Sequence, residues 1–214
     1  MSERSERIVV LDYGSGNLRS AERALERAGA HVTVTGDLTA AAEAEGLVVP
    51  GVGAFAACMA GIEAIGAGPV IAERVAAGRP VLGICVGMQV LFEHGDEHGV
   101  VTKGLGLLPG AVTRLAAARL PHMGWNTVHA PASSTLFAGL PADSRFYFVH
   151  SYGVTDPAAL AAAGATVTTA HHETDFVAAV ERGALSAAQF HPEKSADTGA
   201  ALLRNWLATV TVGG

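Results

Sequence analysis

The sequence has few cysteines, few charges and no long hydrophobic run, and each shortage excludes a class of protein. Its 214 residues include only Cys58 and Cys85, too few to staple a chain of this length. Charged residues make up 16% of the chain, the net charge is −6 and no Lys/Arg cluster occurs, so we expect no nucleic-acid binding. The apolar runs are far shorter than the roughly 18 residues of a membrane span, and Met1–Arg7 is polar, unlike a signal peptide. These features predict a soluble, reduced, cytoplasmic protein.

Half of the residues are hydrophobic, enough to bury one substantial core, so we expect a single domain over residues 1–214. Strand-like runs alternate with helical patterns through the first ninety residues. The predicted strands are Ile8–Asp12, His31–Val34, Gly46–Val49 and Val81–Ile84; the predicted helices are 18–28, capped by Asn17 and ended by Gly29, then 55–62, 70–77 and 86–92. This alternation predicts a doubly wound α/β fold with a mostly parallel sheet flanked by helices.

The pattern changes from about Gly110, where strand-like runs follow one another without helices between them. The predicted strands are Ala111–Leu115, Phe146–Tyr152, Ala165–Thr169, Phe176–Val180 and Ala184–Phe190. We expect this part to be mixed or antiparallel. A final helix, capped by Asp197, presents an apolar side that includes Trp206.

A cysteine lies between two glycines where a predicted buried strand meets a helix. Gly83-Ile84-Cys85-Val86-Gly87 has the G-x-C-x-G spacing of a nucleophile elbow, whose sharp turn directs the reactive side chain outward. Glycine is needed because the neighbouring backbone comes too close for a Cβ atom. The start of the helix favours a reactive thiolate, and the Val86 N–H points at a developing oxyanion. Cys85 is therefore the candidate nucleophile, although a lone cysteine is as often structural.

Two polar residues with i, i+2 spacing follow the last predicted strand. His191 and Glu193 emerge at the sheet edge where open α/β folds bind ligands. In an extended segment such residues point the same way, so the carboxylate can hold one imidazole nitrogen while the other faces a thiol. Taken alone, H-x-E is more often a surface histidine beside a solvated glutamate. Together with Cys85, the pair predicts a Cys–His–Glu triad for nucleophilic catalysis.

Small residues follow the strand that should lie beside the nucleophile. Pro50-Gly51-Val52-Gly53 would let a backbone N–H approach a substrate carbonyl, so we expect this loop to supply a second oxyanion donor. Without the other motifs, this segment would indicate only a tight turn.

These motifs resemble a known family. The G-x-C-x-G elbow and the His-Pro-Glu ending are similar to those of class I (triad) glutamine amidotransferases. Nearly the whole chain resembles the glutaminase subunits of imidazole glycerol phosphate synthase, through Asp12–Leu18, Pro50–Phe55, Gly83–Phe92, Pro121–Asn126, Phe146–Tyr152 and Gln189–Ser195. The segment at 121–126 is the most specific. Val86 and Ala188 depart from the family's usual Leu and Gly, but neither removes a functional group.

The resemblance implies a flavodoxin-like fold and a reaction that needs no cofactor or metal. Glutamine would be hydrolysed to glutamate and ammonia. The ammonia would pass to a (β/α)₈-barrel cyclase subunit, which makes imidazole glycerol phosphate and aminoimidazole carboxamide ribotide in histidine biosynthesis.

The resemblance also implies roles for single residues. Cys85, His191 and Glu193 would be the triad, with Val52 in the oxyanion loop and the N–H groups of Gly53 and Val86 as oxyanion donors. Against the substrate would lie Gln89 at its α-amino or carboxylate group, Glu97 at its ammonium, and the backbone of Ser151 and Tyr152. Toward the cyclase would lie Asn17, Trp125, Tyr147 and Lys194.

Two other functions stay open. A glutaminase of the pyridoxal phosphate or anthranilate synthase type would share the elbow and the His-Pro-Glu ending, but Pro121–Asn126 and Asp12–Leu18 favour the histidine pathway. A catalytically silent regulatory subunit would keep the fold, but every triad position is intact.

Three further patterns carry no expected function. His94 and His98 have i, i+4 spacing, but glycines interrupt any helix there, so we expect a solvated loop rather than a metal site. Cys58 falls on an apolar helix face and should be a core thiol. Gly14-Ser15-Gly16 lacks the third glycine of a dinucleotide-binding turn, because Arg19 stands there.

Overall fold

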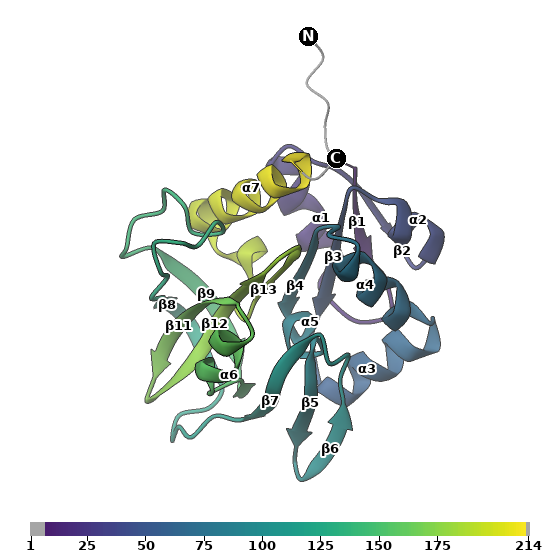
Figure 1. Ribbon diagram of the computed structural model, residues 1–214. Coiled ribbons are helices and arrows are strands. Elements are labelled where there is room, and N and C mark those ends of the chain that lie inside the picture. The colour runs from purple at the N-terminus through teal and green to yellow at the C-terminus, as the bar shows by residue number, and fades with distance from the viewer. Residues whose placement is uncertain (1–6, 213–214) are drawn as a thin grey trace.

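A seven-stranded sheet forms the centre of the molecule in the computed structural model, which describes residues 7–212 (Figure 1). The strand order is β11-β12-β13-β4-β3-β1-β2. The parallel strands are β1 (Arg7–Leu11), β2 (His31–Thr35), β3 (Gly46–Gly51), β4 (Val81–Cys85) and β13 (Leu185–Ala188). At one edge, β12 (Thr174–Arg182) and β11 (Thr166–His172) continue the sheet antiparallel. The predicted fold class is confirmed.

Helices cover both faces of this sheet. They are α1 (Leu18–Arg27), α2 (Leu38–Glu43), α3 (Phe55–Ala64), α4 (Ala67–Ala76), α5 (Val86–Gln89), α6 (Pro157–Ala162), the 3₁₀ turn η1 (Pro192–Lys194) and α7 (Ala196–Val212). Because β2 and β3 lie on opposite sides of β1, right-handed crossovers put α1 and α2 on opposite faces. Helix α1 packs against α7, and α2 packs against α4.

Two smaller sheets flank the central one. The first has the order β10-β7-β5-β6 and contains β5 (Phe92–Glu97), β6 (Val100–Lys103), β7 (Leu108–Arg114) and β10 (Tyr152–Gly153). The second pairs β8 (His122–Thr127) with β9 (Arg145–His150) antiparallel. After Gly110, β8 pairs with β9 and β11 pairs with β12 antiparallel, whereas β13 runs parallel to β4, so this part of the chain is mixed, as predicted.

The core lies between the central sheet and its helices. Every residue of β3 and β4 is buried, as expected for inner strands of a parallel sheet that is covered on both faces. Trp206 of α7 is fully buried and lies close to Gly46, where a Cβ atom would come within 2.9 Å of its ring.

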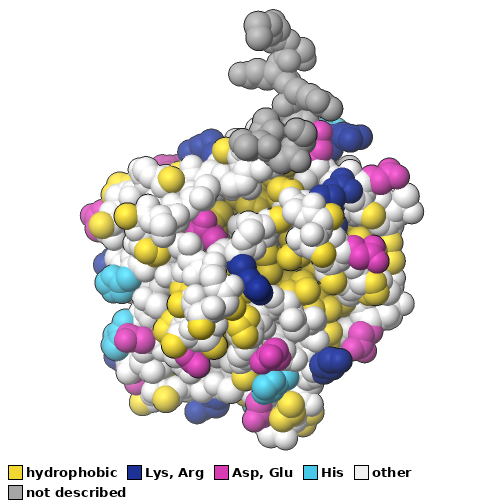
Figure 2. Space-filling model, in the orientation of Figure 1, with side chains coloured by type: hydrophobic (Ala, Val, Ile, Leu, Met, Phe, Trp, Pro, Cys, Tyr) yellow, Lys and Arg dark blue, Asp and Glu magenta, His cyan; other side chains and the backbone are white. Residues whose placement is uncertain are grey.

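On the face shown in Figure 2, acidic and basic side chains are interspersed, and no basic patch gathers. Within residues 7–212 no single helix is long and apolar enough to cross a membrane; α3 and α4 pass that test only together, and they are bent by 91° at the break between them.

Three predictions about helix ends are wrong. The predicted helix 86–92 stops at Gln89, because the backbone of Val90 and Phe92 bonds instead to the 105–106 segment. Asn17 precedes α1, but its side chain makes no capping hydrogen bond. Asp197 does not cap α7; it lies inside the first turn of a helix that begins at Ala196.

Other local predictions also fail. His94 lies in strand β5 rather than in a solvated loop. His98 and Gly99, which both have positive φ, form the tight turn between β5 and β6. The sequence patterns also did not indicate β6 or β8. Strand β8 depends on pairing with β9, which lies about twenty residues further along the chain, and local patterns do not display such a partner.

Candidate active site

Cys85 lies at the sharp turn between β4 and α5. Its φ of 57° and ψ of −115° are unusual for a residue with a side chain, and strained backbone of this kind clusters at functional sites. The flanking residues must be glycine, because a side chain at either position would clash with the backbone. A Cβ atom on Gly87 would lie 1.9 Å from the Val49 carbonyl oxygen, and one on Gly83 would lie 2.7 Å from the Gly87 carbonyl oxygen. The G-x-C-x-G spacing therefore reflects the elbow geometry.

The imidazole of His191 follows the carboxyl end of β13, which lies beside β4 in the sheet. Its Nδ1 atom lies 2.7 Å from Oε1 of Glu193, and both side chains are almost fully buried. His191 lines the same cavity as Cys85. The structure thus brings the three predicted triad residues together from two adjacent parallel strands.

The charge state of His191 is set by competing effects. Burial disfavours the imidazolium, but hydrogen bonding and charge interactions with Cys85 and Glu193 outweigh burial and raise the pKa of His191 to about 9. A protonated imidazole near neutrality is the partner that stabilises a thiolate. Because α5 is only four residues long, we attribute this stabilisation to His191 rather than to a helix dipole.

A cavity of about 220 Å³ opens above Cys85. All seven residues expected at the oxyanion or substrate line it, together with Cys85 and His191: Val52, Gly53, Val86, Gln89, Glu97, Ser151 and Tyr152. The cavity lies at the carboxyl ends of β3, β4 and β13, where open α/β sheets bind ligands. Its other lining residues are Val149, His150 and Lys194. The size suits a small polar molecule.

Three side chains that carried no expected role hold the end of β3 and the loop that follows it. The Tyr13 hydroxyl donates to the Pro50 carbonyl at 2.5 Å, and burial raises the pKa of Tyr13 far above its usual range. The Ser15 hydroxyl donates to the Val52 carbonyl at 2.8 Å, and the Cys58 thiol reaches the same carbonyl at 3.4 Å. Cys58 is buried as predicted, and burial raises its pKa, but it also contacts this loop.

Two of the lining residues have partners that restrict what they can bind. The amide nitrogen of Gln89 donates to the Tyr152 carbonyl at 3.0 Å and to the side-chain oxygen of Gln189 at 2.9 Å, so its own oxygen is left as an acceptor. This arrangement favours an ammonium over a carboxylate beside Gln89. Glu97 accepts the N–H of Phe55 at the start of α3 through one oxygen, which leaves the other oxygen for a cation.

Three of the four residues expected at a partner interface gather on one surface. Trp125 of β8 and Tyr147 of β9 are directly opposite each other, with ring centroids 6.0 Å apart, and Lys194 extends over the Tyr147 ring. Trp125 is 49% exposed, which is high for a side chain of its size. Asn17 lines a small cavity of about 10 Å³ together with His191 and Glu193.

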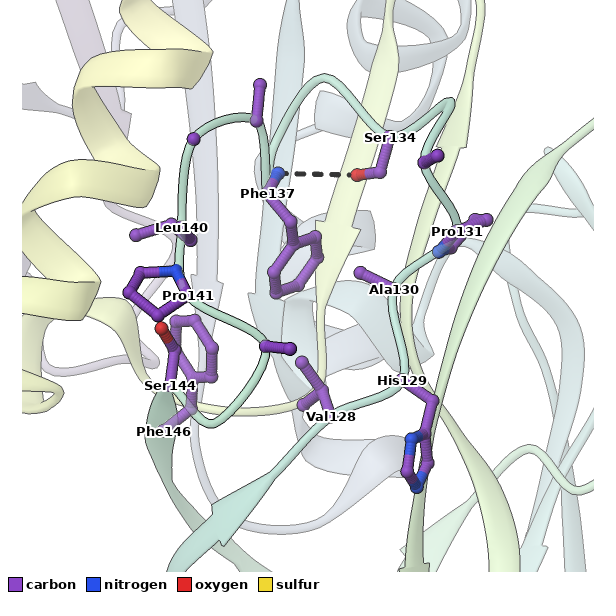
Figure 3. A pocket seen from close by; sticks show the side chains of 14 residues that line it. Val128, His129, Ala130, Pro131, Ser134, Phe137, Leu140, Pro141, Ser144 and Phe146 are labelled. Atoms are coloured by element: carbon purple, nitrogen blue, oxygen red, sulfur yellow. Dashed lines mark hydrogen bonds between the residues drawn. The ribbon is translucent and has the colours of Figure 1, made fainter.

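Larger cavities lie elsewhere but hold no comparable chemistry. One of about 390 Å³ is enclosed by the 128–146 segment, and in Figure 3 the ring of His129 points away from Phe137 and Pro141. Another, of about 720 Å³, is lined mainly by glycine, alanine, serine and threonine, with Glu181 as its charged residue. Within residues 7–212, no three His, Cys, Asp or Glu side chains gather in a way that could hold a metal ion.

Residues 9–210 match the sequence model of a protein family described as glutamine amidotransferase class-I. The chain belongs to this family. Curated relatives of this amidotransferase are named "Imidazole glycerol phosphate synthase subunit HisH". The protein of Mycolicibacterium paratuberculosis is 63% identical, covering 95% of this chain and 98% of the relative. The Thermobifida fusca protein is 61% identical, and the match covers 95% of this chain and 99% of the relative. The Streptomyces avermitilis protein is 59% identical, and the match covers 96% of this chain and 98% of the relative. The resemblance seen in the sequence is confirmed.

Solved structures support the fold of this amidotransferase. A chain described as glutamine amidotransferase has a TM-score of 0.75 at 22% identity, covering 95% of this chain and 98% of that one. A putative GMP synthase protein of Thermoplasma acidophilum has a TM-score of 0.73 at 21% identity, covering 98% and 96%. At these identities the likeness concerns the fold alone.

Proposed function

We propose that this chain is the glutaminase subunit of imidazole glycerol phosphate synthase, with residues 1–214 forming one amidotransferase domain. The observation that carries the proposal is the strained Cys85 elbow in one cavity with the buried His191–Glu193 pair. The relatives named as HisH subunits, about 60% identical over nearly their full length, support the pathway.

The reaction divides into two halves at Cys85. Its thiolate attacks the side-chain carbonyl carbon of glutamine, and the N–H groups of Gly53 and Val86 bind the oxyanion that forms. His191 then gives its proton to the amide nitrogen, so ammonia leaves and a thioester remains. Water attacks the thioester while His191 takes a proton from it, and glutamate departs as the thiolate is restored. Glu193 keeps His191 in the required tautomer.

The substrate's amino-acid end would lie at the far side of the cavity. The free oxygens of Gln89 and Glu97 are placed to accept its ammonium group, because their other polar atoms are already bonded. The backbone of Ser151 and Tyr152, also in the lining, would contact the rest of the amino-acid portion.

The ammonia would be used by a partner rather than released. A (β/α)₈-barrel cyclase subunit, forming a heterodimer with this chain, would convert it into imidazole glycerol phosphate in histidine biosynthesis. The exposed Trp125, with Tyr147 and Lys194 beside it, is the surface that we assign to this partner, and Asn17 would lie near its edge. Two free cysteines support a reducing, cytoplasmic location.

The test is glutamate release from glutamine by the full chain, alone and with the cyclase and its ligand. We expect Cys85→Ala to abolish release while the melting temperature changes little. An electrophilic glutamine analogue should alkylate Cys85 and leave the second thiol, Cys58, unmodified, as peptide mass spectrometry would show. Unchanged activity in Cys85→Ala would refute the mechanism, and failure to co-purify with any (β/α)₈ cyclase would refute the pathway.

A further inference from the structure

A continuous series of hydrogen bonds runs from the surface strand β8 to the cavity. The Asn126 amide nitrogen lies 3.2 Å from Nε2 of His122, and Nδ1 of His122 lies 3.0 Å from Nε2 of His150. Nδ1 of His150 lies 2.9 Å from the Tyr152 carbonyl oxygen. Both imidazoles are buried. Three side chains from two strands thus end on one backbone carbonyl at the active site.

Backbone groups at both ends fix the direction of every bond in this series. The Tyr152 carbonyl can only accept, so Nδ1 of His150 must carry a proton and its Nε2 must accept from His122. His122 then also has its proton on Nδ1, and its Nε2 accepts from Asn126. At the outer end, the Asn126 amide nitrogen donates to the His171 carbonyl at 2.9 Å, which independently requires the same orientation.

The Tyr152 carbonyl also fixes a second branch that leads to Cys85. Because this oxygen accepts from Gln89, the Gln89 amide nitrogen must face it, and the same nitrogen donates to the Gln189 oxygen. The Gln189 amide nitrogen is then directed at the Cys85 sulfur, 3.9 Å away. Both glutamines are buried. One carbonyl therefore decides the orientation of both glutamine amides.

The series is complete only while both imidazoles are neutral. A second proton on His122 would face the Asn126 amide hydrogens, and one on His150 would face the proton of His122. Burial, with a smaller contribution from the neighbouring His172, lowers the pKa of His122 to about 4; burial is also the main cause that lowers the pKa of His150 to about 3. The ring of His172 stacks on that of His122, with centroids 4.3 Å apart.

The most specific sequence segment, Pro121–Asn126, divides its side chains between this series and the surface. His122 is buried in the series and Asn126 joins it from a partly buried position, while Met123 and Trp125 between them are 66% and 49% exposed. Alternation along a strand accounts for this division. The surface that we assign to the partner and the series of buried rings are therefore opposite sides of one strand.

We propose that Asn126, His122 and His150 are positioning residues of the glutaminase site. Their ordered hydrogen bonds hold the Tyr152 carbonyl, and that carbonyl holds the Gln89 amide in the orientation that leaves its oxygen free for substrate. The inference deepens the proposed function and rests on it for the effect on glutamine, but the arrangement of protons can be tested without any substrate.

The first experiment is NMR of the full chain with ¹⁵N-labelled histidine rings, with signals assigned through His122→Asn and His150→Asn. We expect both rings to be neutral at pH 7 with the proton on Nδ1, although free histidine in water favours Nε2. Both should stay neutral down to about pH 5. A proton on Nε2 of either ring at pH 7, or titration near pH 6.5, would overturn the proposal.

The second experiment separates positioning from general stability through glutaminase kinetics. His122→Ala should raise KM for glutamine about tenfold and lower kcat less. The reason is that the Gln89 oxygen would no longer be held where it accepts the charge-assisted hydrogen bond from the substrate's ammonium group. His122→Asn keeps a donor near the Nδ1 position and should recover most of the affinity. His171→Asn is the matched control: among residues 7–212 its side chain hydrogen-bonds only to Asp175, and it is the backbone carbonyl of His171 that joins the series.

Each result bears on one proposal. An unchanged KM in His122→Ala, or an Asn variant no better than the Ala variant, would overturn the positioning role. If His122→Ala fails to fold, Asn126→Ala removes the outer donor without altering a buried ring, and the same rise in KM is expected. No glutamine hydrolysis by the wild-type chain would count against the proposed function, while the NMR result would still decide the proton arrangement.

Discussion

The Nδ1 atom of His191 lies 2.7 Å from Oε1 of Glu193, and the other carboxylate oxygen of Glu193 is buried with no hydrogen-bond partner among the described residues. Glu193 is therefore directed at one group, the imidazole. Replacing a carboxylate in such a pair with an amide permits the wrong tautomer. We expect Glu193→Gln to lower kcat about 10²- to 10⁴-fold, with KM for glutamine little changed. Steady-state kinetics on variants of equal melting temperature would check this, and a kcat within threefold of wild type would contradict it.

The hydroxyl of Ser15 holds the loop that should bind the oxyanion. Because a trans peptide directs its carbonyl and N–H oppositely, tying the Val52 oxygen to Ser15 turns the Gly53 N–H away from Ser15. We expect Ser15→Ala to lower kcat about tenfold through a less ordered donor. Ser15→Thr keeps the hydroxyl and serves as the control. A kcat for Ser15→Ala equal to or above that of wild type would show that Ser15 does not hold a productive loop.

The tightest approach of backbone at the elbow is at Gly87. An alanine there would place its Cβ 1.9 Å from the Val49 carbonyl oxygen, and backbone cannot yield cheaply. We expect Gly87→Ala to lose on the order of 3 kcal/mol of unfolding free energy, or to fail to fold. Gly153→Ala is the matched control, since its Cβ would meet nothing closer than 3.5 Å. Urea unfolding of the two variants decides, and equal stability would show that the elbow can relax.

The exposed Trp125 should anchor the partner subunit. Large aromatic side chains at the centre of an interface commonly carry about 2 kcal/mol or more of binding energy. We expect Trp125→Ala to weaken binding of the cyclase by about tenfold or more. Val101→Ala, which truncates a residue 66% exposed on β6, is the control and should bind normally. Calorimetric titration measures both, and equal affinities for wild type and Trp125→Ala would place the interface elsewhere.

The buried histidines make the fold sensitive to acid. The pKa values of His122 and His150 are about 4 and about 3, whereas unfolded histidine titrates near 6.5. Below pH 6.5 the unfolded chain therefore binds more protons than the folded chain, so stability falls as the pH falls. Between pH 7 and 5.5, wild type should lose roughly 1 kcal/mol more than His150→Phe. Urea unfolding at both pH values tests this, and His31→Asn, at the start of β2, is the control. Equal losses of unfolding free energy in wild type and His150→Phe would contradict the prediction.

The sequence alone determined the parallel α/β framework and the position of the candidate nucleophile. Alternating strand and helix patterns, and glycines on both sides of Cys85, are local features that follow from backbone geometry over a few residues. The i, i+2 spacing of His191 and Glu193 is equally local, which is why their hydrogen bond was predictable.

Only the tertiary structure decided what surrounds those residues. Ser15 meets Val52 across 37 residues, His122 meets His150 across 28, and Gln89 meets Gln189 across 100. The short length of α5 and the pairing of β8 with β9 likewise depend on distant segments. Such contacts have no periodic signature, because the hydrogen-bond partner of a buried polar group is set by how the sheets pack rather than by its neighbours in the chain.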